Sequence, residues 1–328
     1  MHDTSRIDDA VLEADQLSLF LRAGRGTELK IVDSVSFSIA RGEFYALVGE
    51  SGSGKTVIAR SLMRLFPPNT LRMEGRLVVD GVDLTTAPAS RVQRMRGRSI
   101  SMIFQEPMTS LNPLMTVERQ IDEAIAVVGG MGRRERRERV VELLADVQFA
   151  NPGSVRSMYP HELSGGMRQR AMIAMALANN PSLLIADEPT TALDVTIQEE
   201  ILQLLLRLRD QHGLSILFIS HDLSLVRRFA DRIGVLYGGV LMETGPAHEL
   251  IDHPTHPYSR ALIDCIPRRR EAGKRQAGID GLVPGVADWF DGCRFAPRCP
   301  RMAEDCRHGR IEMTPTQPAQ VARCLHPL

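Results

Sequence analysis

The chain has 328 residues, in which 40 lysines and arginines balance 40 aspartates and glutamates. This length allows one large core with a smaller appended unit, and the zero formal charge gives no sign of a polyanionic partner such as nucleic acid. Apolar runs such as 214–219 are too short to cross a bilayer, and residues 1–6 lack the features of a secretory signal. We therefore expect a soluble, cytoplasmic chain that needs other subunits to act at a membrane.

Short strands separated by turns are expected in the first 48 residues. Segments 17–21 and 35–39 alternate apolar with other side chains, and turn residues follow at Gly24-Arg25-Gly26 and Arg41-Gly42. Further on, Asp80-Gly81 is a hairpin signal. These patterns predict antiparallel strands that precede the apolar strand over 44–48.

The stretch 49–56 reads Gly-Glu-Ser-Gly-Ser-Gly-Lys-Thr and lies between the apolar run 44–48 and a helix-compatible stretch 56–65. This is a phosphate-loop motif in its required strand-to-helix context. Its glycines let successive N–H groups point into one concavity, which favours a polyphosphate. We expect Lys55 to reach the β- and γ-phosphates and the Thr56 hydroxyl to bind Mg²⁺. The residues expected to cradle the nucleotide are Gly49, Ser51, Gly52, Ser53, Gly54, Lys55 and Thr56.

The alternative interpretation of this stretch is a glycine-rich turn that binds no ligand. It does not account for the presence of every fixed position of the motif between strand and helix. The sequence therefore predicts nucleotide binding, which many unrelated functions share.

A helical segment interrupts the strands between about 106 and 163. A strand over 99–104 ends at Gln105, and helices are expected over 117–128 and 133–147. The run 133–139 is basic but interleaved with acids at helical spacing. We interpret it as a solvated helix face, with a docking surface as the alternative.

Strand and helix alternation then resumes. The continuous apolar runs 183–186 and 216–219 are typical of parallel strands covered on both faces, and the helix pattern 195–211 lies between them. The sequence thus predicts an α/β fold, a doubly wound sheet with a helical insertion.

Polar residues follow two of these strands. Asp187 is placed to hold the Mg²⁺ shell, and Glu188 to accept a proton from an attacking water or to orient it. The alternative is that this acidic pair only caps the next helix. His221 ends the second strand, where we expect it to contact the γ-phosphate; a lone histidine is otherwise more often structural.

Residues 163–170 read Leu-Ser-Gly-Gly-Met-Arg-Gln-Arg and open a helix whose apolar stripe is core packing. Ser164, Gly165 and Gly166 expose N–H groups, a hydroxyl and a helix dipole, which is a second phosphate-binding arrangement. One nucleotide does not need two such arrangements. We therefore expect the second to serve a nucleotide held by another subunit.

Taken together and in this order, these motifs resemble those of ABC-type ATPases over about residues 11–245. The resemblance implies a P-loop NTPase fold with an antiparallel β subdomain and a helical subdomain. It also implies a head-to-tail dimer with two ATPs, each held between one phosphate loop and the opposite signature. Carried over by position, Gln105 senses Mg²⁺ and the γ-phosphate, and Asp194 bridges the interface.

The same resemblance implies that Ser164 and Gly166 touch the partner's ATP and that Glu188 is the catalytic base. The family stacks adenine on an aromatic residue after the first strand, and the nearest candidate is Phe20. Because Leu17, Leu19 and Leu21 share one face, Phe20 points the other way. It is either the stacking residue or an ordinary surface aromatic.

All five cysteines fall in the tail after residue 245, at Cys265, Cys293, Cys299, Cys306 and Cys324. In a reducing compartment, four cysteines close together in the sequence are expected to bind a metal rather than to form disulfides. The last four suit tetrahedral zinc or a four-iron cluster, and their spacing does not choose between them; unrelated free thiols are the alternative. Cys265 stands apart and is expected to be a packed thiol. Residues 268–275 are expected to form an exposed linker, with contact to anionic lipid as the alternative.

This tail, residues 246–328, resembles that of ATP-binding subunits of oligopeptide and dipeptide ABC importers. The shared features are His-Pro-Thr-His-Pro-Tyr at 253–258, Pro284-Gly285 and Cys-Arg-Phe-Ala-Pro-Arg-Cys-Pro at 293–300. The family's further proline is replaced by Ala287-Asp288-Trp289. The resemblance implies a [4Fe-4S] cluster on Cys293, Cys299, Cys306 and Cys324, in a small cysteine-rich C-terminal domain.

It further implies two membrane permeases, a related second ATPase subunit and an extracytoplasmic solute-binding protein, with this chain on the cytoplasmic face of the membrane. The expected function is ATP hydrolysis that energises peptide import, with the segment 105–113 as the coupling surface. Import of another solute, such as nickel or a glycoside, is an alternative. The second alternative is a soluble ABC protein of nucleic-acid or translation machinery. The single nucleotide module and the zero formal charge of this chain argue against it.

Overall fold

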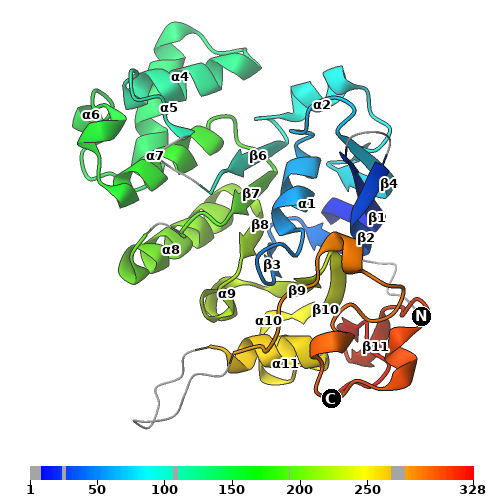
Figure 1. Cartoon of the computed structure of the whole chain (residues 1–328). Helices are drawn as coiled ribbons and strands as arrows, with labels where there is room; N and C mark the ends of the chain where they lie inside the picture. The colour runs from blue at the N-terminus through cyan, green and yellow to red at the C-terminus, as the bar shows by residue number, and fades with distance from the viewer. Residues whose placement is uncertain (1–8, 24–26, 106–109, 192, 267–277) are drawn as a thin grey trace, which may run out of the picture. The chain divides into compact units, whose positions relative to one another are not determined.

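The computed structural model describes residues 9–23, 27–105, 110–191, 193–266 and 278–328 (Figure 1). The expected turn at 24–26 and the expected linker 268–275 lie outside these ranges. The chain divides into two compact units: unit 1 comprises Met1–Leu12, Ile39–Phe44 and Val78–Phe218, and unit 2 comprises Glu13–Ser38, Tyr45–Leu77 and Ile219–Leu328. Among the described residues, no helix is long and apolar enough to span a membrane.

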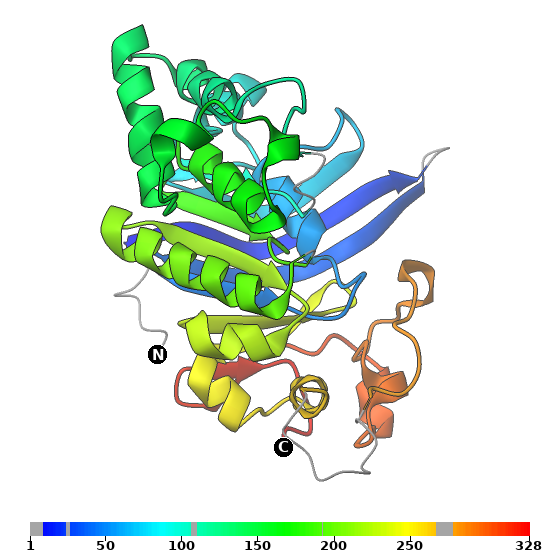
Figure 2. The ribbon, with the colours of Figure 1, turned by 90° about the vertical axis from the view of Figure 1, so that its left-hand side faces the viewer.

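The N-terminal strands form a four-stranded sheet in the order β2-β1-β4-β5, and Figure 2 shows the long β1 and β2 side by side. Leu17 and Leu19 of β1 are fully buried, because alternate side chains of a strand share one face. Val79 pairs with Val82 across the Asp80-Gly81 turn, which confirms the predicted hairpin. The strands are β1 (Ala10–Ala23), β2 (Thr27–Ala40), β4 (Leu71–Val79) and β5 (Val82–Asp83).

In unit 2 the strands of the larger sheet follow the order β11-β12-β10-β9-β3. β3 pairs parallel with β9, and β10 pairs antiparallel with β9 and with β12. All residues of β3 are buried, as expected for an apolar strand with neighbours on both faces. The strands are β3 (Phe44–Val48), β9 (Arg232–Tyr237), β10 (Val240–Pro246), β11 (Thr314–Gln317) and β12 (Gln320–Ala322).

The helices of unit 2 include one that follows the phosphate loop and several short ones in the tail. They are α1 (Lys55–Leu62), α9 (Leu223–Phe229), α10 (Ala247–Asp252), α11 (Pro257–Asp264), η3 (Val286–Asp288), η4 (Ala296–Arg298) and η5 (Glu304–Arg307). Tyr237, Tyr258 and Phe295 form an aromatic cluster with ring centroids 4.6–5.4 Å apart. This cluster gives the tail a buried apolar core.

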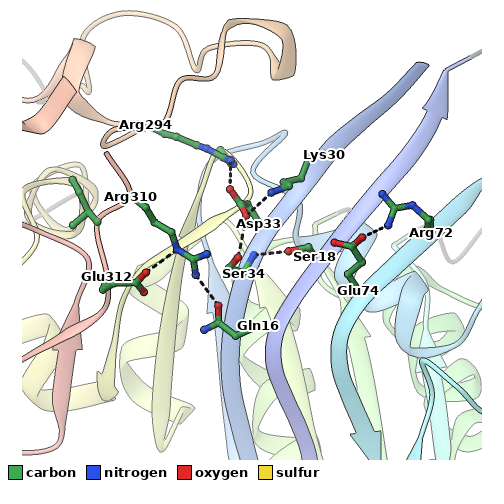
Figure 3. A network of polar contacts seen from close by, with 12 residues as sticks. Gln16, Ser18, Lys30, Asp33, Ser34, Arg72, Glu74, Arg294, Arg310 and Glu312 are labelled. Carbon is green, nitrogen blue, oxygen red and sulfur yellow. Dashed lines mark hydrogen bonds and ion pairs between the residues drawn. The ribbon is translucent and has the colours of Figure 1, made fainter. Parts of the chain in front are cut away.

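Polar contacts also join the tail to β1 and β2 within unit 2 (Figure 3). Arg294 Nη2 lies 2.9 Å from Asp33 Oδ2, and Arg310 Nη2 donates to Gln16 Oε1 at 2.7 Å. Burial alone would raise the pKa of Asp33, but Lys30 and Arg294 outweigh it and hold that pKa below its usual range. The carboxylate therefore stays charged, which suits its role as an anchor for the tail.

In unit 1, β6 pairs parallel with β7, and β8 follows β7 in the strand order. The strand predicted at 99–104 and both buried apolar runs are confirmed. The strands are β6 (Ile100–Ile103), β7 (Leu183–Asp187) and β8 (Ser215–Ser220), the last of which ends in unit 2. The Ile216 N–H donates to the Glu43 carbonyl at 2.8 Å, which ties the start of β8 to the residue before β3.

The helices of unit 1 include α4 and α5 of the predicted insertion, which group with the following helix α7 in green in Figure 2. The basic run on α5 is largely exposed, with ion pairs such as Arg134–Glu138 at 3.0 Å, which agrees with the solvated-face interpretation. The helices are α2 (Ala89–Met95), α4 (Val117–Val128), α5 (Arg133–Asp146), α6 (Pro152–Val155), η2 (Pro160–Glu162), α7 (Gly165–Ala176) and α8 (Val195–His212).

Candidate functional site

The phosphate loop of unit 2 connects the buried β3 to α1, as its sequence predicts. A Cβ atom at Gly49 would lie 2.0 Å from the Leu236 carbonyl oxygen on β9, so only glycine allows this approach. Gly54 begins the helix with φ 104°, a left-handed conformation that side chains disfavour. The glycines therefore set the loop's path against β9.

The Lys55 ammonium curls back over this loop. It donates to the carbonyl oxygens of Gly49 at 2.7 Å and Glu50 at 3.0 Å, and to Ser53 Oγ at 3.3 Å. Lys55 and Ser53 are buried, whereas Ser51 and Gly52 are exposed and Thr56 is half-buried. The loop thus holds a positive charge in place at the start of a helix, an arrangement that suits phosphate.

The predicted carboxylate pair lies at the end of β7 in unit 1. Asp187 is the last residue of that buried strand and is 2% exposed, and Glu188 follows with φ 47°. The Gln105 Nε2 donates to Glu188 Oε2 at 3.2 Å, and Thr191 Oγ1 donates to the same oxygen at 3.1 Å. The structure therefore brings Gln105 and Glu188 together, although 83 positions separate them.

The signature segment begins α7 in the same unit. Ser164 is the N-cap, and its Oγ accepts from the Met167 N–H at 3.3 Å. Ser164 and Gly165 are exposed. A Cβ at Gly166 would come within 3.0 Å of Ile197 on α8, so a small residue is needed there.

Asp194 is exposed and caps α8, where its Oδ1 accepts from the Ile197 N–H at 3.0 Å. Its predicted interface role is compatible with this position, because the side chain is exposed and the helix cap engages only its Oδ1 atom. Ala192, next to this turn, lies outside the described residues.

His221 follows β8 in unit 2 and is exposed, while the neighbouring Asp222 caps α9. Phe20 on β1 is half-buried, with the Arg72 guanidinium carbon 3.9 Å and the Lys30 ammonium 5.5 Å from its ring centroid. One cation therefore already stacks closely on this ring.

The four tail cysteines meet at one small cavity lined by Cys293, Cys299, Cys306 and Cys324. The Cys293 N–H also donates to the Cys306 carbonyl at 2.8 Å, which ties two of the cysteine-bearing segments to each other. Cys265 lies at the end of α11 and is not among the cavity-lining residues, as its separate position in the sequence predicts.

Burial raises the pKa of the Cys293 thiol to about 11, and the other three cysteines add to this. Burial likewise raises the pKa values of Cys299 and Cys324. Mutual repulsion opposes four thiolates in one place, and a bound cation reverses that effect. Among the described residues, the three potential metal ligands whose donor atoms lie within 4.8 Å of one another are Asp305, Cys306 and His326 rather than the four cysteines.

Sequence reasoning missed two groups beside these sites. His326 also lines the cysteine cavity, with its Nε2 2.9 Å from Asp305 Oδ1. Glu50, at a variable position of the phosphate-loop motif, accepts a two-point contact from Arg298 of the tail. No sequence pattern links these pairs, since each partner lies on a different turn or strand end.

Comparison with known proteins identifies the class first. The family model described as ABC transporter matches residues 32–191. A solved structure of a dimeric bacterial ABC transporter cassette, MJ0796, aligns with a TM-score of 0.63 and 29% identity over 72% of this chain and 99% of that one. The cassette cbiO1 of Clostridium perfringens aligns with a TM-score of 0.64 and 25% identity over 75% and 92%. Fold and motifs together define an ABC-type ATPase.

The tail narrows the identification. The family model described as oligopeptide/dipeptide transporter, C-terminal region, matches residues 242–306. A putative peptide import ATP-binding protein of Brucella melitensis is 46% identical over 90% of this chain and 89% of its own length. The dipeptide transport ATP-binding protein DppD of Escherichia coli is 42% identical over 97% of both. The chain therefore belongs to the ABC transporter ATP-binding proteins that carry this C-terminal region, an ATPase family that uses ATP and Mg²⁺ and works as a dimer with membrane permeases.

Proposed function

We propose that this chain is the ATP-hydrolysing subunit that energises import of oligopeptides or dipeptides across the cytoplasmic membrane. One observation carries the proposal: the chain joins an ABC cassette to the oligopeptide/dipeptide C-terminal region and matches a dipeptide transport subunit over 97% of both lengths. We assign residues 11–245 to the nucleotide-binding domain, with its helical subdomain at about 106–163, and residues 246–328 to the tail domain.

In this proposal the phosphate loop binds the triphosphate of ATP. Residues 49–54 offer backbone N–H groups, Lys55 neutralises the β- and γ-phosphates, and Thr56, Gln105 and Asp187 hold Mg²⁺. The contacts of Lys55 with the loop carbonyls support its role, because they hold the ammonium against the loop. Phe20 is the proposed contact for adenine.

Glu188 is the proposed general base, which accepts the proton of the attacking water. The hydrogen bonds from Gln105 and Thr191 hold its carboxylate in one orientation, as a base must be held. In this proposal Gln105 senses the γ-phosphate and contacts the Glu188 base at the same time. His221 would donate a further hydrogen bond to that phosphate. Magnesium supplies charge neutralisation on the phosphate oxygens.

The second ATPase subunit, which we take to be a paralogue, completes the site. Ser164, Gly165 and Gly166 of one subunit would contact the ATP held by the other, and Asp194 would bridge the interface. The exposure of Ser164, Gly165 and Asp194 supports this, since a group that serves another chain must be accessible. ATP binding would close the dimer, and hydrolysis would reopen it.

Two permeases and an extracytoplasmic solute-binding protein would complete the importer, with this chain peripheral on the cytoplasmic face. The coupling surface is proposed at 105–113, of which 106–109 lie outside the described residues. Beside it, Leu114 is 84% exposed, while Gln120 fixes Asn112 through bonds of 2.8 and 3.1 Å. An exposed leucine on a braced turn suits docking to another protein.

For the tail, we propose a [4Fe-4S] cluster on Cys293, Cys299, Cys306 and Cys324, with Zn²⁺ as the alternative. The cavity that all four cysteines line supports this proposal, because it brings four sulfur donors to one place. The cluster would have a structural or regulatory role, because the chain offers no substrate path.

Replacing Glu188 by glutamine tests the proposed base. We expect turnover to fall by about 10²–10⁴-fold, the usual contribution of a general base, with Mg-ATP binding retained and a stable ATP-bound dimer in size-exclusion chromatography. The exposed surface variant Glu142→Gln is the matched control and should hydrolyse ATP as the wild type does. Loss of ATP binding in Glu188→Gln would assign that residue to binding instead.

Co-purification from membranes tests the transport assignment. We expect two permeases, a related ATPase and a peptide-binding protein to accompany the chain. A binding protein specific for nickel or a glycoside would replace the peptide assignment. Turnover stimulated by DNA or RNA would favour the nucleic-acid alternative.

A further inference from the structure

The phosphate loop is fastened to the C-terminal tail at Glu50. The Arg298 guanidinium meets the Glu50 carboxylate in a two-point contact, Nη1 to Oε2 at 2.7 Å and Nη2 to Oε1 at 3.1 Å. The Arg298 side chain is 4% exposed and that of Glu50 27%. Such a bidentate and largely buried pair is stronger and more directional than the ion pairs of an open surface.

A second tail residue holds the backbone at the same position. The Glu50 N–H donates to the Tyr258 hydroxyl at 3.0 Å. Tyr258 is fully buried, and its ring packs edge-on against Tyr237 at 4.6 Å between centroids. Burial raises the pKa of Tyr258, so the hydroxyl stays protonated and neutral. Both the main chain and the side chain of Glu50 are thus fixed by the tail.

Arg298 is itself held firmly on the tail side. It donates to the Tyr237 hydroxyl at 3.2 Å and to the carbonyl oxygens of Ile279 at 3.1 Å and Asp280 at 2.8 Å. It ends η4 and directly precedes Cys299, one of the cavity-lining cysteines. The position of the guanidinium therefore follows the conformation of the segment 293–299.

Glu50 also contacts the phosphate-binding lysine. The Lys55 ammonium donates to the Glu50 carbonyl at 3.0 Å, so the residue that the tail fixes is one of the acceptors that hold Lys55. A displacement of Glu50 would move this carbonyl and the adjoining N–H groups of the loop. Placement errors of about 1 Å in such a site can cost about 100-fold in rate.

We propose that Arg298 is a positioning residue for the phosphate loop, through which the cysteine-bearing tail sets the affinity of the chain for nucleotide. The proposal rests on the proposed role of residues 49–56 in binding ATP. Coupling between two sites is reciprocal, so bound nucleotide also stabilises the tail segment 293–299 against opening.

A double-mutant cycle on the full-length chain tests this link. Arg298→Gln, Glu50→Gln and the double variant are compared for dissociation constants of Mg-ATP by calorimetry. We expect each single change to weaken binding about tenfold, within the usual range for coupled sites, and the double variant to lose little more. Arg298→Lys should lie between, since lysine keeps the charge but not the two-point geometry.

Arg307→Gln is the matched control, because Arg307 is an exposed tail arginine that pairs only at 3.9 Å with Glu304. It should bind Mg-ATP as the wild type does. If Arg298 only anchored the tail, Arg298→Gln would lower the melting temperature and leave the dissociation constant of Mg-ATP unchanged at temperatures where the protein is folded. That result would overturn the proposal.

Hydrogen exchange supplies a second readout that does not depend on turnover. A non-hydrolysable ATP analogue should slow amide exchange in peptides covering 293–299 of the wild type, and this protection should be lost in Glu50→Gln, which leaves the tail sequence intact. Equal protection in both proteins would contradict the link. Failure of the wild type to bind nucleotide at all would instead refute the proposed function, so the two failures are distinguishable.

Discussion

The phosphate loop and the cysteine cavity both belong to unit 2, but they are assembled differently. The loop is eight consecutive residues, 49–56, whose glycines and following helix set its shape. The cavity draws Cys293, Cys299, Cys306 and Cys324 from turns and a strand end spread over the tail. The loop combines N–H groups with one lysine, which suits an anion, whereas the cavity is lined by four cysteine thiols.

This difference shows how each site depends on its surroundings. The loop needs only close backbone contact with β9, since its donors are main-chain groups. The cavity needs separate segments of the tail to fold together, since its four cysteines come from positions between 293 and 324. We therefore expect the substitution of one loop glycine to abolish the loop's conformation. The substitution of one cavity cysteine should instead destabilise the tail before it affects the loop.

Gly49→Ala should give the largest effect. The new Cβ would lie 2.0 Å from the Leu236 carbonyl oxygen, so the loop must move away from β9. A shift of about 1 Å should weaken Mg-ATP binding by about 100-fold or more. Calorimetry of the purified variant measures this, with circular dichroism to verify that it is folded.

Gly278→Ala is its control, because a Cβ there meets no atom of the described residues within 4 Å. This variant should bind Mg-ATP normally. Wild-type affinity in Gly49→Ala would mean that the loop tolerates displacement, and the contrast with the cysteine cavity would then disappear.

Cys306→Ser should remove the proposed cluster from the tail, with a smaller effect on nucleotide binding than Gly49→Ala has. Wild-type protein purified without oxygen should be brown, with broad absorption near ~400 nm from thiolate-ligated iron. The variant should lose this colour and melt several degrees lower, because metal binding contributes folding free energy. Absorption spectra, metal analysis and thermal scans measure these changes.

Cys265→Ser provides the matched cysteine control, since Cys265 is not among the residues that line the cavity. It should keep both colour and metal. A colourless wild type that contains stoichiometric zinc would overturn the iron–sulfur assignment while leaving the four-cysteine site intact.

Phe20→Ala should have the smallest effect and tests how far the nucleotide site extends beyond the contiguous loop. If Phe20 stacks on adenine, its loss should weaken ATP binding by about fivefold, from about 1 kcal/mol of stacking. Pyrophosphate binding should not change, since it lacks the base. Unchanged ATP affinity would leave Phe20 as a surface aromatic that stacks with Arg72.

Much of the fold could be predicted because local patterns agree with it. The helix predicted over 117–128 is α4, and the Asp80-Gly81 hairpin joins β4 to β5. Periodicity and turn chemistry act over a few residues, so they are visible in the sequence. The pairing of the tail strand β12 with β10 was not predicted, because antiparallel partners 77 or more positions apart share no local signal.

The candidate site divides in the same way. Asp187, Glu188 and Ser164 could be named from strand ends and a helix start, and their local contacts agree with those positions. The contact between Glu50 and Arg298 joins residues 248 positions apart, so it could not be predicted from the sequence. Nothing about an arginine between two cysteines indicates which carboxylate it meets.

The sequence by itself therefore determined the local motifs of this protein: a phosphate-loop motif, a carboxylate pair after a buried strand, a signature helix start and four clustered cysteines. These depend on residue type and short spacing, which are local properties. Only the tertiary structure decided that the tail reaches the loop through Arg298 and Tyr258. That contact requires the tail to pack its aromatic core beside β9 and β10, and long-range packing is a property of the folded chain rather than of any one segment.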